Sequence, residues 1–399
     1  MGSGFDAAAA TAAYLRTLSP EAHARAIAYT HGSHWLLLWG LLATIVSALI
    51  ILKSGVLRRV EGRLEAKQPR PKTVAFVCAV IFFAIDFAIE MPWNSYAQWW
   101  RERSYGLTSQ SWSGWAGEQL AGAAISLVLT GVFAMILYLL IRRAPRAWWA
   151  WAGGLVALFL AFTIILSPIF IEPLFNKFTP APPGQLRDQV VQLAKASGVP
   201  SDKIYVYNGS KQSNRYTANV SGLFGTARVA MSDTMFQRGA DLGEVRAVVG
   251  HEMGHYARYH VLWGVLAMSL LAVLFFWLID RLFPRMQRLL GEDRLKGIVD
   301  PAGLPIVVIL AAVLAFIATP LLSSLTRFGE MDADRFSLEH AREPDGLARA
   351  LVKTIEYRAA SPSRLEEILF YDHPSVERRI RRAMDWKQAH LNEASQART

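Results

Sequence analysis

Six long apolar stretches dominate the pattern of hydrophobic and polar positions along the chain. Each is long enough to cross the hydrocarbon core of a bilayer, about 30 Å thick, as an α-helix. Tryptophans and basic residues stand at many of their ends, as expected for anchors at the membrane interface. The pattern therefore predicts a multi-pass integral membrane protein with six spans. They comprise residues 35–52, 74–91, 120–141, 148–171, 261–279 and 304–325.

The composition agrees with this prediction, because 53% of the 399 residues are hydrophobic and only 19% are charged, which is too apolar for an ordinary soluble protein. An amphipathic helix near 185–196 and two short strands, in KIYVYN and TARVAMS, are predicted between spans four and five. The predicted fold class is mainly α: a polytopic membrane helix bundle with a small inserted α+β domain and a helical C-terminal tail. Four regions follow: a membrane region with four spans (1–171), the inserted block (172–260), spans five and six (261–325) and an Arg-rich tail (326–399).

The formal charge of +10 reflects basic residues that cluster in loops beside the predicted spans. Loops 53–72, 142–147 and 280–303 contain seven, three and five Lys or Arg residues, whereas the opposite loop, 92–119, contains two. Membrane topology and anionic lipid headgroups account for this charge, so the lipid bilayer, and not nucleic acid, is the expected partner. By the positive-inside rule the three basic loops face the cytoplasm, which places the inserted block and both termini on the other side.

Three residues inside the second span are unusual for an apolar segment. Cys78 is the only cysteine, which excludes a disulfide framework and a thiolate metal site, and it is interpreted as a small apolar filler. Asp86 and Glu90 stand four residues apart on one helical face. Acids within a membrane face a cavity or a bonding partner, so both the lining of a chamber and a structural hydrogen bond are open interpretations.

The chemistry of the chain is concentrated in HEMGH, residues 251–255, directly before the fifth span. Two histidines four residues apart on a helix project the same way and can chelate one Zn²⁺ ion. Glu252 follows the first histidine and is placed to act as general base on a water that the metal activates. Asp241, three residues before Glu244, predicts the start of the helix that carries the motif.

A hydrolytic zinc site needs a third protein ligand. A third histidine six residues after His255 is excluded, because that position is Val261. His260 is one residue short of it, is expected to point off the ligand face, and is interpreted as an interfacial residue. An intramembrane protease with its motif buried in a span and an Asp from a second span is also disfavoured, since HEMGH precedes the span and Asp300 lies in a charged loop.

The third ligand is predicted in GEMDAD, residues 329–334, just after the sixth span. Glu330 and Asp334 form a carboxylate pair at helical spacing. Glu330 is expected to ligate the metal, while Asp334, from the next turn, accepts a hydrogen bond from a ligand histidine. By itself this pair would fit a solvated acidic helix start equally well; together with HEMGH it favours one Zn²⁺ ion per chain.

With these motifs the sequence resembles the integral-membrane zinc metalloproteases of the type I CAAX prenyl endopeptidase group, within the Glu-zincins. The resemblance extends from about Phe87 to Trp386. Besides HEMGH and GEMDAD it rests on MPW at 91–93, IEPLFNKF at 171–178, SNRYTANVSGLFG at 213–225 and DHPSVERR at 372–379. It implies a membrane endopeptidase whose helices enclose a water-filled chamber and whose substrates are membrane-tethered polypeptides or prenylated peptides.

The resemblance also implies roles for individual residues. His251, His255 and Glu330 correspond to the zinc ligands, Glu252 to the general base, and Asp334 to a carboxylate that orients a ligand. His373 would stabilise the oxyanion and Arg378 would orient the site, with Arg379 as its rival. A substrate strand would pair with the edge segment formed by Thr217, Ala218, Asn219 and Val220, although the family has Asn where this chain has Thr217.

Two further expectations stay open at this point. Family members have seven spans, and this chain shows six. The resemblance places the catalytic block in the cytosol, whereas the charge of the short loops places it outside. The expected membrane is a bacterial inner membrane or an equivalent endomembrane. A membrane transporter or scaffold that holds a structural zinc is the alternative function, and an open coordination position beside Glu252 argues against it.

Overall fold

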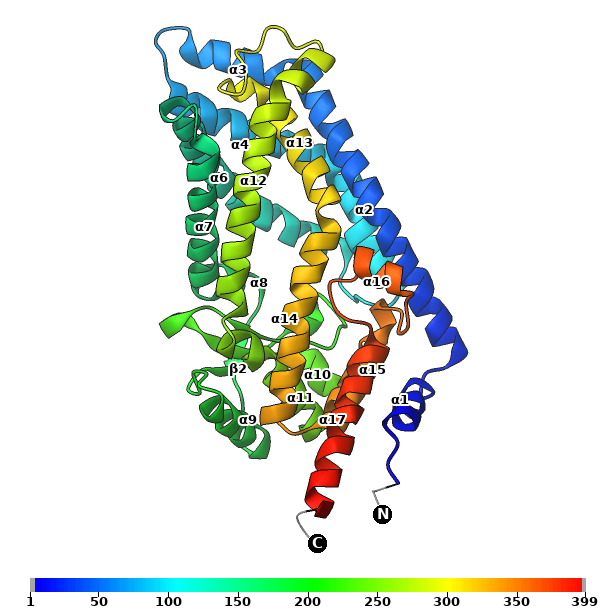
Figure 1. Ribbon diagram of the computed structural model, residues 1–399. Coiled ribbons are helices and arrows are strands. Elements are labelled where there is room, and N and C mark those ends of the chain that lie inside the picture. The colour runs from blue at the N-terminus through cyan, green and yellow to red at the C-terminus, as the bar shows by residue number, and fades with distance from the viewer. Residues whose placement is uncertain (1–3, 397–399) are drawn as a thin grey trace.

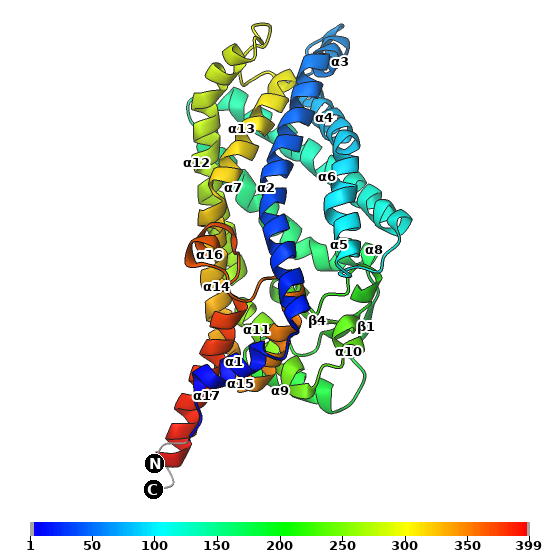
Figure 2. The same cartoon turned by 90° about the vertical axis from the view of Figure 1, so that its right-hand side faces the viewer.

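A computed structural model describes residues 4–396. Among these residues, five helices are long and apolar enough to cross a membrane, and they run side by side along the long axis of the molecule (Figures 1 and 2). The protein is thus a multi-pass membrane protein, and the predicted mainly α fold class is confirmed. The five helices are α2 (Pro20–Ser54), α4 (Pro71–Asn94), α6 (Trp112–Arg143), α7 (Trp148–Leu166) and α12 (His260–Leu289).

The sixth predicted span is a bent pair of helices. α13 (Leu304–Ile317) ends at Ala318, and α14 (Thr319–His340) continues from it at an angle of 55°. Pro320 is the second residue of α14, where a proline is tolerated because its missing N–H would have no helical partner. The bend matters for function, since α14 leaves the membrane bundle and enters the inserted domain (Figure 1).

The three basic loops lie together at the end of the bundle opposite the sheet (Figure 1). Lys53, at the end of α2, donates to Glu292 Oε1 at 2.9 Å, and Lys296 donates to Glu61 of α3 (Val56–Glu65) at 3.0 Å. Arg142, in the last turn of α6, donates to the carbonyl of Pro71 at 3.2 Å. The charge asymmetry that the sequence shows is therefore an asymmetry between the two ends of one molecule.

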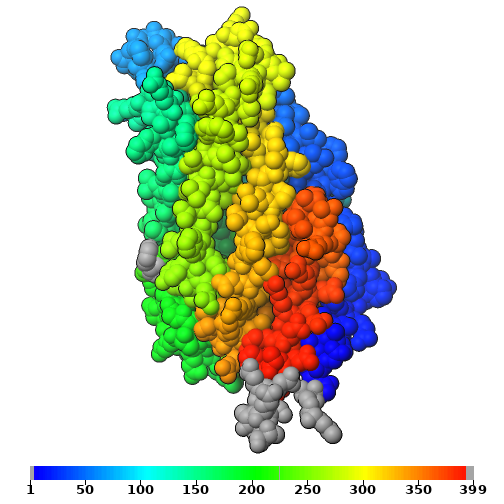
Figure 3. All heavy atoms as spheres, in the orientation of Figure 1, coloured from blue at the N-terminus to red at the C-terminus, as the bar shows by residue number. Residues whose placement is uncertain are grey.

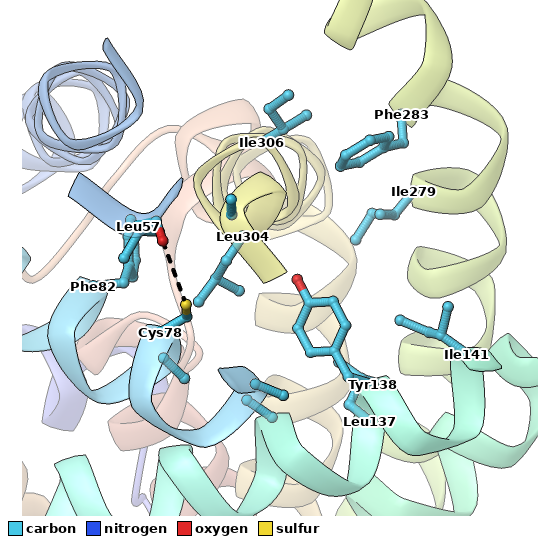
Figure 4. Packing of buried hydrophobic residues seen from close by; sticks show 14 of the residues in the cluster. Leu57, Cys78, Phe82, Leu137, Tyr138, Ile141, Ile279, Phe283, Leu304 and Ile306 are labelled. Carbon is cyan, nitrogen blue, oxygen red and sulfur yellow. Dashed lines mark hydrogen bonds between the residues drawn. The ribbon is translucent and has the colours of Figure 1, made fainter. Parts of the chain in front are cut away.

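The core of the bundle near this end is apolar and closely packed (Figure 4). Cys78 is fully buried, with its Sγ 3.8 Å from the carbonyl oxygen of Leu57, as suits a small filler residue. Gly131 of α6 allows a close approach to α4, because a Cβ there would lie 2.7 Å from the ring of Phe76.

Asp86 and Glu90 each make a structural hydrogen bond and also line a cavity, so both interpretations of this acidic pair apply. Ser47 of α2 donates to Asp86 at 2.6 Å, and Thr44 donates to Glu90 at 2.9 Å. Both carboxylates also line a cavity of about 370 Å³ between α4 and α6. They connect α2 to α4 and present two carboxyl groups to a cavity within the bundle.

The inserted block folds into a four-stranded sheet with helices against it. The strand order is β1-β2-β4-β3, with β2 parallel to β4 and the other pairs antiparallel. β3 therefore lies at an edge of the sheet, with no further strand beside it among residues 4–396. The strands are β1 (Phe178–Pro180), β2 (Ile204–Tyr207), β3 (Ala218–Ser221) and β4 (Arg228–Ser232), and the predicted amphipathic helix is α9 (Gln185–Ala196).

Two glycines bring the helix with HEMGH, α11 (Leu242–Ala257), against α14. A Cβ at Gly250 would lie 3.1 Å from both Ala341 and Ser337, and one at Gly254 would lie 3.1 Å from Ala333. Ser337 also donates to the carbonyl of Ala247 at 2.7 Å. Small residues four apart on both helices thus permit a close crossing, which places Glu330 beside the histidines.

The C-terminal region covers this crossing, and its last helices lie beside α14 on the face shown in Figure 3. It contains α15 (Pro344–Lys353), α16 (Arg364–Phe370) and α17 (Val376–Gln396). The shorter helices are α1 (Ala7–Leu15), α5 (Arg101–Ser104), α8 (Glu172–Phe175) and α10 (Asp233–Gln237), with π-helical turns at Ser95–Trp100 and Ser167–Ile171.

Candidate active site

The helix α11 begins where the sequence predicts. Asp241 is its N-cap and accepts a hydrogen bond from the backbone N–H of Glu244 at 2.8 Å. From there the helix is continuous through His255, so His251 and His255 lie one above the other on the face toward α14.

Donor atoms of three residues, from two helices, converge beside this face. His251 Nε2 and His255 Nε2 are 3.2 Å apart, His251 Nε2 is 3.2 Å from Glu330 Oε2, and His255 Nε2 is 3.4 Å from Glu330 Oε1. With bond lengths of about 2.0–2.1 Å, ligands of a tetrahedral zinc ion are separated by roughly 3.3 Å. The spacing therefore fits three corners of such a tetrahedron.

Glu330 gives an independent indication that a cation belongs here. Its side chain is only 8% exposed, and its Oε2 is buried without a hydrogen-bond donor among the described residues. A buried carboxylate oxygen without a partner is costly. A metal ion held by His251, His255 and Glu330 would satisfy this oxygen.

Asp334 and Arg379 hold His251 in place. His251 Nδ1 is 2.9 Å from Asp334 Oδ1, so its proton is assigned to Nδ1 and the lone pair of Nε2 faces the other donor atoms. Arg379 donates to both oxygens of Asp334, at 2.7 and 2.6 Å. This chain of charged hydrogen bonds is buried and fixes the ring orientation of one candidate ligand.

The assignment of Arg378 to this position is wrong. The side chain of Arg378 is 55% exposed and donates to Glu367 at 2.9 Å, away from the metal-ligating atoms. Arg379 is 7% exposed and is the arginine that reaches Asp334. The reason is helical geometry: neighbours on α17 point about 100° apart, so only one of the two faces α14.

The interpretation of His260 as an interfacial residue is also wrong. Its Nδ1 lies 3.0 Å from His255 Nδ1, and its Nε2 lies 3.1 Å from Asp332 Oδ2. Because His255 Nε2 faces the other ligands, His255 donates from Nδ1 to His260, and His260 then donates from Nε2 to Asp332. Tyr259, just before it, has φ 57°, and this break between α11 and α12 turns His260 back toward His255.

Replacing His260 with alanine is expected to weaken zinc binding by about 10- to 100-fold, because His255 loses the acceptor that fixes its tautomer. Titration of the purified protein against a chromophoric chelator measures this directly. His340→Ala is the matched control, since the His340 ring stacks on Phe336 and bonds to that residue's carbonyl. Equal zinc affinity in both variants would contradict the assignment.

His373 faces the same atoms from the loop before α17. Its Nε2 is 3.2 Å from Glu330 Oε1 and 3.5 Å from Arg358 Nη2, and its Nδ1 is 2.8 Å from Asp372 Oδ1. Burial, together with the charge of Arg358, lowers the pKa of His373, although Asp372 opposes the shift. The imidazole is thus held next to the candidate metal with its Nε2 toward the space where a substrate would lie.

Glu252 has no hydrogen bond or ion pair with any residue in the described part of the chain. Burial raises the pKa of its carboxyl, against the opposing charges of His251 and His255. A free carboxylate with a raised pKa beside a metal site is a suitable general base.

Of the predicted edge segment, Ala218, Asn219 and Val220 belong to β3, and Thr217 directly precedes it. The carbonyl of Thr217 accepts from Ser232 N at 3.1 Å on the β4 side. Asn219 Oδ1 is buried without a donor within residues 4–396. The open side of β3 therefore has backbone groups, and one amide oxygen, available to a bound strand.

Comparison with known proteins identifies the family to which this arrangement of site residues belongs. The pattern of peptidase family M48 matches residues 180–387, more than half of the chain. The chain belongs to peptidase family M48. Residues 7–177 of this M48 peptidase also match the CAAX prenyl protease N-terminal region, described as five membrane helices. In that interval the structure has four long apolar helices, α2, α4, α6 and α7, preceded by the short α1.

The relatives cover most of the chain. An uncharacterized metalloprotease of Bacillus subtilis, YhfN, is 30% identical over 84% of this chain and 79% of its own length. The CAAX prenyl protease 1 homolog of Arabidopsis thaliana is 28% identical over 77% and 72%. The fold is similar to the crystal structure of S. mikatae Ste24p, with a TM-score of 0.75 at 21% identity, over 92% of this chain and 90% of that one. The M48 peptidase is thus an integral-membrane metalloendopeptidase.

Proposed function

We propose that this M48 peptidase is a zinc-dependent endopeptidase that hydrolyses peptide bonds of membrane-associated polypeptides, as a CAAX prenyl protease does. The observation that supports this most directly is the convergence of His251, His255 and Glu330 at tetrahedral spacing, with Glu252 unpaired beside them. A purely structural zinc site has four protein ligands; this group offers three.

Each residue around the site has a separate role in peptide hydrolysis. Zn²⁺, when bound, supplies a Lewis acid that polarises the scissile carbonyl and acidifies a water. Glu252 accepts the proton of the attacking water and returns it to the leaving amine. His373 can donate from Nε2 to the developing oxyanion only when it is protonated; burial lowers its pKa, and the charges of Asp372 and of the oxyanion itself oppose that shift. Such a donor contributes about 3 kcal/mol in comparable sites. Arg379 acts through Asp334, by holding His251.

The substrate binds as an added strand on the open edge of β3. Main-chain hydrogen bonds to Ala218 and Val220, whose backbone groups point away from β4, would align the scissile bond with little dependence on side chains, while the backbone of Asn219 pairs with β4. The Arabidopsis relative is, by its name, a homolog of CAAX prenyl protease 1. We extend this to prenylated peptides here, and include unprenylated membrane-tethered polypeptides as substrates of the same site.

The proposal predicts that purified protein in vesicles cleaves a membrane-tethered peptide, and that a chelator such as 1,10-phenanthroline abolishes cleavage. Stoichiometric Zn²⁺ should restore it, because the three ligands are already positioned. Mass spectrometry of the products reads out both the rate and the bond cleaved. Cleavage that persists after complete removal of metal would overturn the zinc-dependent mechanism.

A further inference from the structure

The short helix α16 has its apolar and acidic side chains arranged in the opposite way to a helix in water. Leu365 and Ile368, three residues apart and therefore on one face, are 66% and 45% exposed. Glu367 is 5% exposed, and its Oε1 accepts from Arg378 at 2.9 Å and from the backbone N–H of Ser375 at 3.2 Å. On a helix in water the carboxylates face the solvent and the leucines face the core. This inversion indicates that the medium around α16 is apolar.

The second acid of α16 also faces the protein. Glu366 Oε1 lies 3.6 Å from His31 Nε2 and 3.7 Å from His34 Nδ1, both on α2, and the His34 ring stacks on Phe370 at 4.3 Å between ring centres. Arg364 is exposed, but it is the first residue of the helix. From an end position its long side chain can extend to lipid headgroups while the rest of the helix contacts an apolar medium.

Backbone groups at both ends of α16 have partners within the protein. Ser363 is the N-cap and accepts from the backbone N–H of Glu366 at 3.2 Å. At the other end Arg327, from α14, donates to the carbonyl of Glu367 at 2.7 Å and to the carbonyl of Tyr371. Water satisfies the last carbonyls of a solvated helix, whereas in a bilayer the protein must do so. The arginine that covers this helix end is the arrangement expected where water is scarce.

The apolar face of α16 continues the surface of a membrane helix. Leu321, Leu325 and Phe328 of α14 are exposed and share one helical face, and α14 forms with α13 the bent pair that is long and apolar enough to cross a membrane. Figures 1 to 3 show α16 at the surface beside α14, at the level of α8, where the fourth membrane helix ends. Single exposed apolar residues need no explanation, but a continuous patch marks a contact with lipid or protein. Continuity with α13 and α14 favours lipid.

We propose that α16 lies in the bilayer, at the boundary between headgroups and acyl chains, with Leu365 and Ile368 in contact with lipid. The interaction places part of the C-terminal region inside the membrane, and it holds whether or not the protein is a peptidase. His373 lies three residues after the last residue of α16. The loop that carries this histidine to the metal-ligating atoms is therefore anchored at one end in lipid.

The test attaches the fluorophore NBD to a single cysteine, at Leu365→Cys or Ile368→Cys, in a Cys78→Ala background of the full chain. The zinc-loaded protein is reconstituted in phosphatidylcholine vesicles, and emission is measured with a nitroxide on the lipid acyl chain or with iodide in the water. Both positions are expected to lose emission with the nitroxide and to be protected from iodide. Their depth should be about 5–10 Å into the boundary between headgroups and acyl chains, as for other interfacial helices.

Two reference positions calibrate the result. Leu158→Cys, on an exposed apolar face of the membrane helix α7, is the reference for lipid, and Arg381→Cys, on an exposed face of α17, is the reference for water. A ratio of nitroxide to iodide quenching nearer to that of Arg381→Cys overturns the inference. Protection from both quenchers also overturns it, because a second copy of the chain or another protein would then cover α16.

A measurement without a label gives a second check. Leu365→Gln in the same vesicles is expected to lower the melting temperature, because an amide transferred from water to an apolar medium without a partner costs free energy. On a face exposed to water the same change would leave the melting temperature unchanged. An unchanged melting temperature would therefore contradict the placement of α16 in lipid.

Discussion

Glu252→Gln is expected to lower kcat/KM by about 10²- to 10⁴-fold while zinc binding is retained, since the change removes a proton acceptor and no ligand. The carboxamide has nearly the same shape and cannot accept the proton of the attacking water. Zinc content by elemental analysis and hydrolysis of a tethered peptide measure the two properties separately. Glu339→Gln, at an exposed carboxylate of α14 paired with Arg335, is the matched control.

The pH dependence sharpens this test. Burial raises the pKa of Glu252, so the base is progressively protonated, and activity lost, as pH falls through that raised value. The charge of bound Zn²⁺ opposes this shift, so the acid limb of kcat/KM in the wild type reports the balance of the two effects, and it should be missing from the residual activity of Glu252→Gln. Near-normal proteolysis by the purified variant would show that another group is the base.

Arg379→Ala is expected to disrupt the site far more than Arg378→Ala, although the two positions are adjacent. Removing Arg379 leaves Asp334 buried and uncompensated, a change that costs about 3–5 kcal/mol. Arg378 pairs with Glu367 from a half-exposed position, and such pairs contribute at most about 1 kcal/mol. Thermal denaturation followed by tryptophan fluorescence, with zinc content measured in parallel, compares the variants.

For Arg379→Ala we expect a lower melting temperature and a partial loss of zinc, because Asp334, which holds His251, loses the arginine that fixes its own position. Arg379→Lys should recover part of the stability, since a single charge remains but the two parallel hydrogen bonds do not. Equal melting temperatures and equal zinc contents in Arg378→Ala and Arg379→Ala would contradict the assignment of Arg379 to the metal site.

Much of the architecture follows from local sequence patterns. The spans, the helix at 185–196 and the start of α11 at Asp241 depend on periodicity and capping, which act over neighbouring residues. The break at Ala318 has a local signal in Pro320, at the start of α14, whereas the direction of the bend depends on how α14 packs on α11. Small residues such as Gly250 and Ala333 were the signal for that packing.

In the candidate active site, too, some features follow from local sequence and others depend on how the helices pack. HEMGH has a fixed geometry because its residues share one helix, and Glu330 with Asp334 adds a second helical pair. The choice between Arg378 and Arg379 depends on the rotation of α17 against α14, which no local pattern specifies. His260 was missed because the left-handed turn at Tyr259 interrupts helical spacing. Arg358 lies outside all motifs; a basic residue 15 positions before His373 has no significance until the fold brings them together.

The candidate metal ligands, two histidines and one glutamate, lie on helices that are connected to two different membrane helices. The imidazoles lie on α11, which is followed after two residues by α12, and the carboxylate lies on α14, the continuation of α13. A metal ion held by both groups would therefore link the membrane helices α12 and α13, and the tilt of such helices responds to bilayer thickness. We therefore expect lipid acyl length to affect how firmly a metal ion is retained, and extraction into short-chain detergent to perturb the candidate metal site as well as the protein's solubility.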